Sequence, residues 1–165
     1  MDNYIEYMVK RAKKSLDYLL VFGVLLAGLA IAYLSTFLLL VPTIMLLLVV
    51  GVIYFVYKML GRINTEYEYL IVNYEMDVDK IISGKTRKRI DSVNLRRIED
   101  FGFLESSEGQ KYLKNSSYKK VDACADKKNG GAFVTYSKNS VNYMLLFTPN
   151  EEMIEYIKKV NPGKF

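Results

Sequence analysis

Hydrophobic and polar residues divide the chain into two regions with different patterns. The first region is a run without any charged residue, forty residues long, from Tyr18 to Tyr57. As a single helix it would be about 60 Å long, roughly twice the thickness of the hydrocarbon core of a bilayer. A small soluble domain cannot bury such a run, so the pattern predicts two transmembrane helices that fold back on each other. We place the two spans at about residues 16–35 and 37–59.

The turn between the two spans is expected between Tyr33 and Pro42. Ser35 and Thr36 are the first adjacent hydroxyl residues of the run, and Thr36 is a candidate cap for the second helix. Pro42 suits the first turn of a helix, where a backbone N–H has no helical partner. The small residues of the segment Gly23–Ala27 would permit close helix packing. The length of the run argues against a cleaved signal peptide.

Charged residues beside the run predict that both of its ends face the cytoplasm. Bases precede the first span and follow the second, whereas the turn carries none; they are Lys10, Arg11, Lys13, Lys14, Lys58 and Arg62. By the positive-inside rule, the chain is a multi-pass protein of the cell membrane with cytoplasmic termini. Residues 1–15 then form a cytoplasmic basic segment, residues 16–60 the transmembrane helical hairpin, and residues 61–165 a cytoplasmic domain.

Residues 61–165 show the alternating pattern of β-strands, interrupted by turn signals such as Ser83-Gly84 and Asn129-Gly130-Gly131. The last segment changes period, because its apolar residues recur at helical spacing. These apolar residues are Met153, Ile154, Ile157 and Val160. Acids precede them and lysines follow, as is typical of a helix. We therefore expect six or seven antiparallel strands followed by one C-terminal amphipathic helix at about residues 150–160.

Two segments carry a resemblance to known proteins. IISGKTRKRIDSVNLRRIEDFG (81–102) and YMLLFTPNEEMIEYIK (143–158) resemble the middle strands and the terminal strand-to-helix junction of bacterial membrane proteins with a pleckstrin-homology-like (PH-like) domain. Over nearly its full length, the chain resembles a family of small two-span membrane proteins from Gram-positive bacteria. The resemblance implies a membrane protein in which a two-helix transmembrane hairpin precedes a small, mostly-β PH-like domain. It implies no catalytic residues, because this fold serves lipid binding, peptide binding and assembly alike.

The segment Glu75–Arg89, EMDVDKIISGKTRKR, is acidic in its first half and basic in its second half. A turn between the halves would place them side by side in a β-hairpin. A three-residue turn that includes Lys85 would pair Asp79 with the last arginine and Val78 with Ile90, which keeps apolar residues on one face. The simplest interpretation is a hairpin that neutralises its own charges, each exposed pair being worth about 0.2–1 kcal/mol.

The bases of this region nevertheless outnumber the acids. Between Lys80 and Arg97 there are seven bases and one acid. Such an excess suits contact with anionic lipid, to which each surface base contributes about 1 kcal/mol, or with an acidic protein segment. The candidate binding residues are Lys85, Arg87, Lys88, Arg89, Arg96 and Arg97. A nucleic-acid partner is not expected, because no RNA-binding motif accompanies the cluster.

Catalysis is not expected either. The chain has no histidine, which removes the commonest general base and metal ligand. Cys124 lies in a strand-like segment without an activating partner. Glu75, Asp77 and Asp79 would share one face of a strand, which leaves a metal-dependent enzyme acting on lipid as an alternative, although pairing with the bases across the hairpin is simpler.

The sequence therefore predicts a membrane-anchored, non-enzymatic adaptor or scaffold without cofactor or metal. Its expected partners are membrane lipids, together with a protein partner or further copies of the chain. A subunit of a larger membrane complex, assembled through the spans and the sheet edges, is the alternative.

Overall fold

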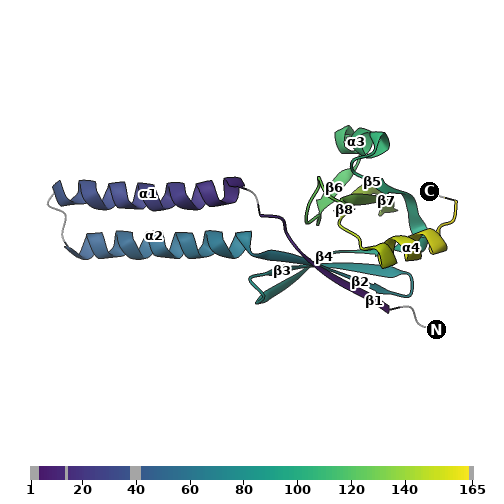
Figure 1. Ribbon diagram of the computed structural model, residues 1–165, viewed down its shortest axis with the longest axis horizontal. Coiled ribbons are helices and arrows are strands. Elements are labelled where there is room, and N and C mark those ends of the chain that lie inside the picture. The colour runs from purple at the N-terminus through teal and green to yellow at the C-terminus, as the bar shows by residue number, and fades with distance from the viewer. Residues whose placement is uncertain (1–3, 14, 38–41, 164–165) are drawn as a thin grey trace. The chain divides into compact units, whose positions relative to one another are not determined.

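The structure is a computed structural model that describes residues 4–13, 15–37 and 42–163. The chain divides into two compact units (Figure 1). The helical unit consists of residues 13–64, and the β unit consists of residues 1–12 and 65–165.

The helical unit contains two apolar helices that lie side by side, α1 (Ser15–Phe37) and α2 (Pro42–Ile63) (Figure 1). Pro42 opens α2, as predicted. Because α1 continues through Phe37, the prediction that Thr36 caps a second helix starting at residue 37 is wrong. The segment 38–41, which connects the two helices, lies outside the described residues.

Of the described helices, one is long and apolar enough to cross a membrane: Ser15–Leu34, with a mean hydropathy of 2.1. Leu46–Gly61 is a shorter apolar segment of α2. The two helices approach each other closely at Gly28, where a Cβ atom would lie 2.8 Å from Cγ1 of Val52. A Cβ at Gly23, in the predicted small-residue pattern, would have no neighbour within 4 Å. Gly28, rather than Gly23, therefore permits the helix contact.

The described part of the β unit contains two four-stranded sheets. The first sheet is antiparallel throughout and has the order β1 (Tyr4–Lys10), β2 (Thr65–Val72), β3 (Glu75–Ile82), β4 (Thr86–Asn94). The second has the order β5 (Ile98–Phe103), β7 (Ala132–Lys138), β8 (Val141–Phe147), β6 (Lys119–Asp122). The 3₁₀-helix η1 (Leu95–Arg97) joins the sheets, α3 (Ser107–Lys114) precedes β6, and α4 (Glu151–Val160) follows β8.

Strands β2–β8 match the predicted number of six or seven, but they are not all antiparallel. β6 pairs with β8 in the parallel direction. The chain leaves β6, passes to β7 on the far side of β8, and returns along β8, so that β6 and β8 run the same way. The prediction of uniformly antiparallel strands is wrong at this edge because the connection is a crossover rather than a hairpin.

β1 is a strand that the sequence analysis missed. It pairs with β2 from Tyr4 opposite Val72 to Lys10 opposite Glu66. The pairing extends one residue further, since the Arg11 N–H donates to the Thr65 carbonyl oxygen at 2.9 Å. Residues 4–10 thus belong to the β unit instead of forming a separate basic segment. In chain order, the helical unit is an insertion between two neighbouring strands of one sheet.

One hydrophobic core joins both sheets to α4. It includes Ile71 of the first sheet, Phe147 of the second and Ile157 of α4, each with no exposed surface. Tyr69 crosses this core from β2: its hydroxyl donates to the Ala123 carbonyl oxygen at 2.7 Å and accepts from the Thr148 N–H at 3.1 Å. Burial raises the pKa of Tyr69. These contacts fix the first sheet against the loops that flank the second.

The predicted C-terminal amphipathic helix is α4 (Figure 1), and its Met153, Tyr156 and Ile157 side chains belong to the core. Asn150 caps its first turn, because the Asn150 side chain accepts a hydrogen bond from the Met153 N–H at 2.9 Å. Two acids lie in the first turn and two lysines in the last, which complements the helix dipole.

Candidate functional site

Strands β3 and β4 form the predicted charged hairpin. Its three-residue turn closes through a hydrogen bond of 3.1 Å from the Lys85 N–H to the Ile82 carbonyl oxygen. Asp79 pairs with Arg89, as predicted, but Val78 pairs with Asp91. The predicted partner of Val78, Ile90, is the extra residue of a β-bulge in β4, so this pairing was wrong by one position.

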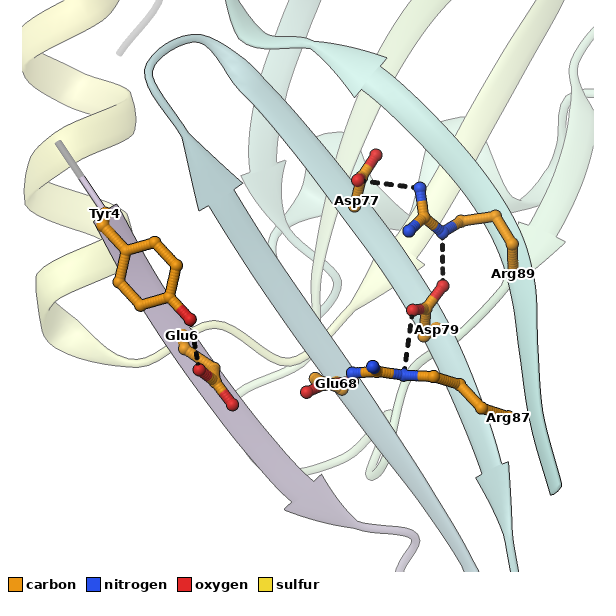
Figure 2. A network of polar contacts seen from close by, with 7 residues as sticks. All are labelled: Tyr4, Glu6, Glu68, Asp77, Asp79, Arg87 and Arg89. Carbon is orange, nitrogen blue, oxygen red and sulfur yellow. Dashed lines mark hydrogen bonds and ion pairs between the residues drawn. The ribbon is translucent and has the colours of Figure 1, made fainter. Parts of the chain in front are cut away.

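The two hairpin arginines cover a row of carboxylates on the first sheet (Figure 2). Nη1 of Arg89 lies 2.7 Å from Oδ2 of Asp77, and its Nε contacts Oδ1 of Asp79. Nε of Arg87 lies 3.2 Å from Oδ2 of Asp79, and its Nη2 contacts Glu68. The hydrogen bond to Asp79 raises the pKa of Arg89. Arg87 and Arg89 together therefore engage three acids.

Burial differs sharply between the partners of this network. Glu68 and Asp79 are only 5% and 8% exposed, whereas the side chains of Arg87 and Arg89 are 57% and 50% exposed. A buried carboxylate without a partner is costly, so the arginines serve the stability of the sheet. The predicted self-pairing of the hairpin is confirmed for these two arginines. Glu68 was not among the expected partners, although its alternation with Tyr67 and Tyr69 was visible in the sequence.

Two of the three carboxylates considered as metal ligands are engaged in the same way. Asp77 and Asp79 both contact Arg89. Among the residues that the structure describes, no group of three or more His, Cys, Asp or Glu side chains is placed to hold a metal ion.

The remaining four candidate bases do not lie in one patch with the arginine pair. Lys85 is exposed in the turn, and Lys88 is exposed opposite Lys80. Arg96 and Arg97 lie in η1, past the other end of β4. At about 3.3 Å per residue, the length of β4 separates the two ends by roughly 25 Å. The continuous basic cluster of the sequence is thus divided into the tip of the hairpin, the ion-pair network and η1.

η1 is held rigidly on both sides. The Leu95 N–H donates to the Tyr74 carbonyl oxygen at 2.7 Å, and the Asn161 side chain donates to the Leu95 carbonyl oxygen at 2.9 Å. The Asn94 side chain accepts from the Arg96 N–H at 3.0 Å. The guanidinium carbon of Arg96 lies 3.4 Å from the centroid of the Tyr74 ring. This stacking fixes the plane of the guanidinium group.

A recess lies between η1 and α4. It has an empty volume of about 460 Å³, open to solvent, and is lined by Tyr74, Arg96, Tyr156, Lys159 and Val160. The Tyr156 hydroxyl donates to the carbonyl oxygen of Asn73, which ties α4 to the β2–β3 turn. Sequence reasoning had assigned Lys159 only to the last turn of the helix, because the proximity of residues 96 and 159 depends on the tertiary fold.

The match to known proteins extends over the whole chain. The family model described as "Bacterial PH-like domain (DUF6106)" matches residues 1–165. The chain belongs to this bacterial PH-like domain family. No curated protein matches it. The PH-like fold and the bacterial origin implied by the resemblance are confirmed, whereas two membrane spans and a Gram-positive source stay predictions.

The cysteine of this bacterial PH-like domain has a structural environment. Cys124 is 6% exposed, and its Sγ lies 3.3 Å from the Thr148 hydroxyl. Burial raises the pKa of the thiol, which keeps it in the protonated form that is a poor nucleophile.

Proposed function

We propose that this bacterial PH-like domain is a non-enzymatic adaptor, anchored in the cell membrane by two crossings of its helical unit. The β unit then lies at the cytoplasmic face, where it contacts anionic lipid or an acidic protein. The pairing of β1 with β2 is the observation that carries this proposal.

The pairing constrains the number of crossings. Lys10 lies opposite Glu66 in the sheet, so the two ends of the helical unit lie on the same side of any membrane it enters. If α1 crosses, α2 must return. With 23 and 22 residues, the helices are each about 33 Å long, which is sufficient for the hydrocarbon core. The bases that flank the helical unit favour the cytoplasmic side for both ends.

A binding role is favoured over catalysis by the state of the reactive groups. Cys124 is a buried thiol with a raised pKa, and Asp77 and Asp79 are paired with arginines. A helical unit anchored in the membrane holds the β unit near the bilayer, where weak contacts with lipid or protein act at high effective concentration. Lys85 in the turn and Lys88 in β4 are exposed, and they are the bases of the hairpin best placed for anionic headgroups, because Arg87 and Arg89 are engaged in the sheet.

The topology can be tested in intact cells and inverted vesicles with a membrane-impermeant maleimide. Single cysteines are placed at Met8, Lys85 and Phe37, the last residue of α1, in a Cys124→Ala chain. We expect Met8→Cys and Lys85→Cys to react only in inverted vesicles and Phe37→Cys only in intact cells. Reaction of all three from the same side would refute two crossings.

The lipid contact can be tested with the full chain in nanodiscs. Amide hydrogen exchange in the β3–β4 turn should slow when phosphatidylglycerol replaces phosphatidylcholine, and the effect should decrease with salt. Lys85→Gln with Lys88→Gln should abolish the slowing, whereas Lys111→Gln with Lys114→Gln, two exposed lysines of α3, should preserve it. Equal exchange in both lipids would refute lipid docking by the tip. A stable larger assembly after mild detergent extraction would instead support the complex-subunit alternative.

A further inference from the structure

We propose that the recess between η1 and α4 is a binding site for a phosphate group, held by Arg96 and Lys159. The inference goes beyond the proposed function, because it requires neither membrane crossing nor lipid contact by the hairpin tip.

The first argument is the distribution of charge. Arg87 and Arg89 each contact two carboxylates on the first sheet. Among the described residues, neither Arg96 nor Lys159 has a carboxylate within ion-pair distance, yet both line the same recess. Two cations that line one recess repel each other, and an anion bound between them offsets that repulsion.

The second argument is that the recess is rigid before any ligand enters. η1 is fixed by the hydrogen bond from the Leu95 N–H to the Tyr74 carbonyl oxygen and by that from the Asn161 side chain to the Leu95 carbonyl oxygen. The helix α4 is fixed through the Tyr156 hydroxyl. The guanidinium of Arg96 lies against the ring of Tyr74, and its N–H groups have no hydrogen-bond acceptor among the residues that the structure describes. A guanidinium held in this way loses little conformational freedom when it binds an oxyanion with two parallel hydrogen bonds.

The third argument concerns the class of anion. A phosphate group accepts a bidentate arginine and a lysine point charge together. Tyr74, Tyr156 and Val160 supply apolar wall beside the cations, which suits an organic phosphate ester better than a fully hydrated ion. The shared chemistry is a phosphate ester, from a soluble metabolite or a lipid headgroup.

A second recess beside this one is unsuited to a phosphate group. It shares Tyr156 and Lys159 but is otherwise lined by Tyr4, Ile5, Glu152 and Glu155. Its two acids repel a phosphate, so the anion is confined to the Arg96 side.

The test uses a fluorescent reporter in the full chain, purified in a non-ionic detergent. The chain has no tryptophan, and Tyr74→Trp retains an aromatic ring under Arg96. We expect tryptophan emission to change with saturation when inorganic phosphate or glycerol 3-phosphate is added, beyond the change with potassium chloride at equal ionic strength. Thermal stabilisation of the unsubstituted chain by the same compounds provides a measurement free of the reporter.

Matched variants decide the outcome. Arg96→Gln with Lys159→Gln should weaken the response at least tenfold, whereas Arg97→Gln with Lys111→Gln removes the same charge elsewhere and should leave it unchanged. A response confined to micelles that contain phosphatidic acid identifies a lipid headgroup as the source. A response to glycerol 3-phosphate that is stronger than the response to inorganic phosphate identifies a soluble phosphate ester. Equal loss in both variants, no loss in the first, or no response of the folded chain to any of these compounds would overturn the proposal.

Discussion

The hydroxyl of Tyr69 connects the two halves of the core, and its removal is a stringent test of the fold. Tyr69→Phe deletes one atom but leaves the Ala123 carbonyl oxygen and the Thr148 N–H without their partner. An unpaired buried polar group costs about 1–3 kcal/mol, so we expect the free energy of unfolding of the β unit to fall by about 2–4 kcal/mol. With a urea dependence of about 2 kcal/mol per molar, the midpoint should shift by roughly 1–2 M.

The measurement is urea unfolding of the full chain in detergent, read by pulse proteolysis, which does not depend on the signal of the helices. Tyr7→Phe is the control: Tyr7 stacks on Tyr69 with ring centroids 6.2 Å apart and is a partly exposed side chain of the same strand pair. We expect a change of less than about 0.5 kcal/mol for it. If the two variants lose the same stability, the Tyr69 hydroxyl does not join the sheets as described.

Three further predictions concern other parts of the chain. Arg89→Gln should destabilise the β unit by about 1–2 kcal/mol, because it leaves the buried Asp79 carboxylate with one arginine fewer. The loss stays moderate because the Arg89 side chain is half exposed. Lys88→Gln should have almost no effect in the same urea titration. Gly28→Leu should separate α1 from α2 and lower the yield of disulfide cross-links between engineered cysteine pairs on the two helices, whereas Gly23→Leu should not. Burial, together with a hydrogen bond to a carboxylate, raises the pKa of Tyr136, so the neutral phenol favours the folded state. The contribution of Tyr136 to stability should be fully present below a pH of about 10, the unfolded pKa, and decrease as the pH rises above it. In urea titrations from about pH 8 to about pH 11, Tyr136→Phe should therefore lose less stability with rising pH than the unsubstituted chain, and an equal loss in both would contradict this.

The sequence was most informative where one physical signal dominated. The charge-free run predicted two helices, and Pro42 was expected in the first turn of the second, although the predicted start at residue 37 was wrong. The apolar stripe and flanking charges predicted α4 within one residue of its observed bounds. The three-residue turn, preferred because it keeps apolar residues on one face, predicted the Asp79–Arg89 pairing. A bulge has no comparable signal in the sequence, so the pairing of Val78 was missed.

The errors arise where a local pattern depends on distant partners. In YIEYMVK, Ile5, Tyr7 and Val9 alternate with outward-facing residues, a strand signal that was interpreted as the basic flank of a membrane span. Its partner strand begins more than fifty residues later. The polar stretch after β5 contains α3, whose cap is Ser106. The Arg96–Lys159 recess could not be predicted, because no periodicity relates these two positions.

The insertion of the helical unit between β1 and β2 imposes an order on biosynthesis. β1 leaves the ribosome first, but Glu66, the partner of Lys10, follows 56 residues later. At about 5–20 residues per second, β1 waits roughly 3–11 s for its partner. A loop of this length costs entropy to close, and α1 packed against α2 would bring its two ends together beforehand. Assembly of the helices would thus act as a checkpoint: a chain whose helices fail to pair keeps an open strand edge, the kind of surface that promotes aggregation.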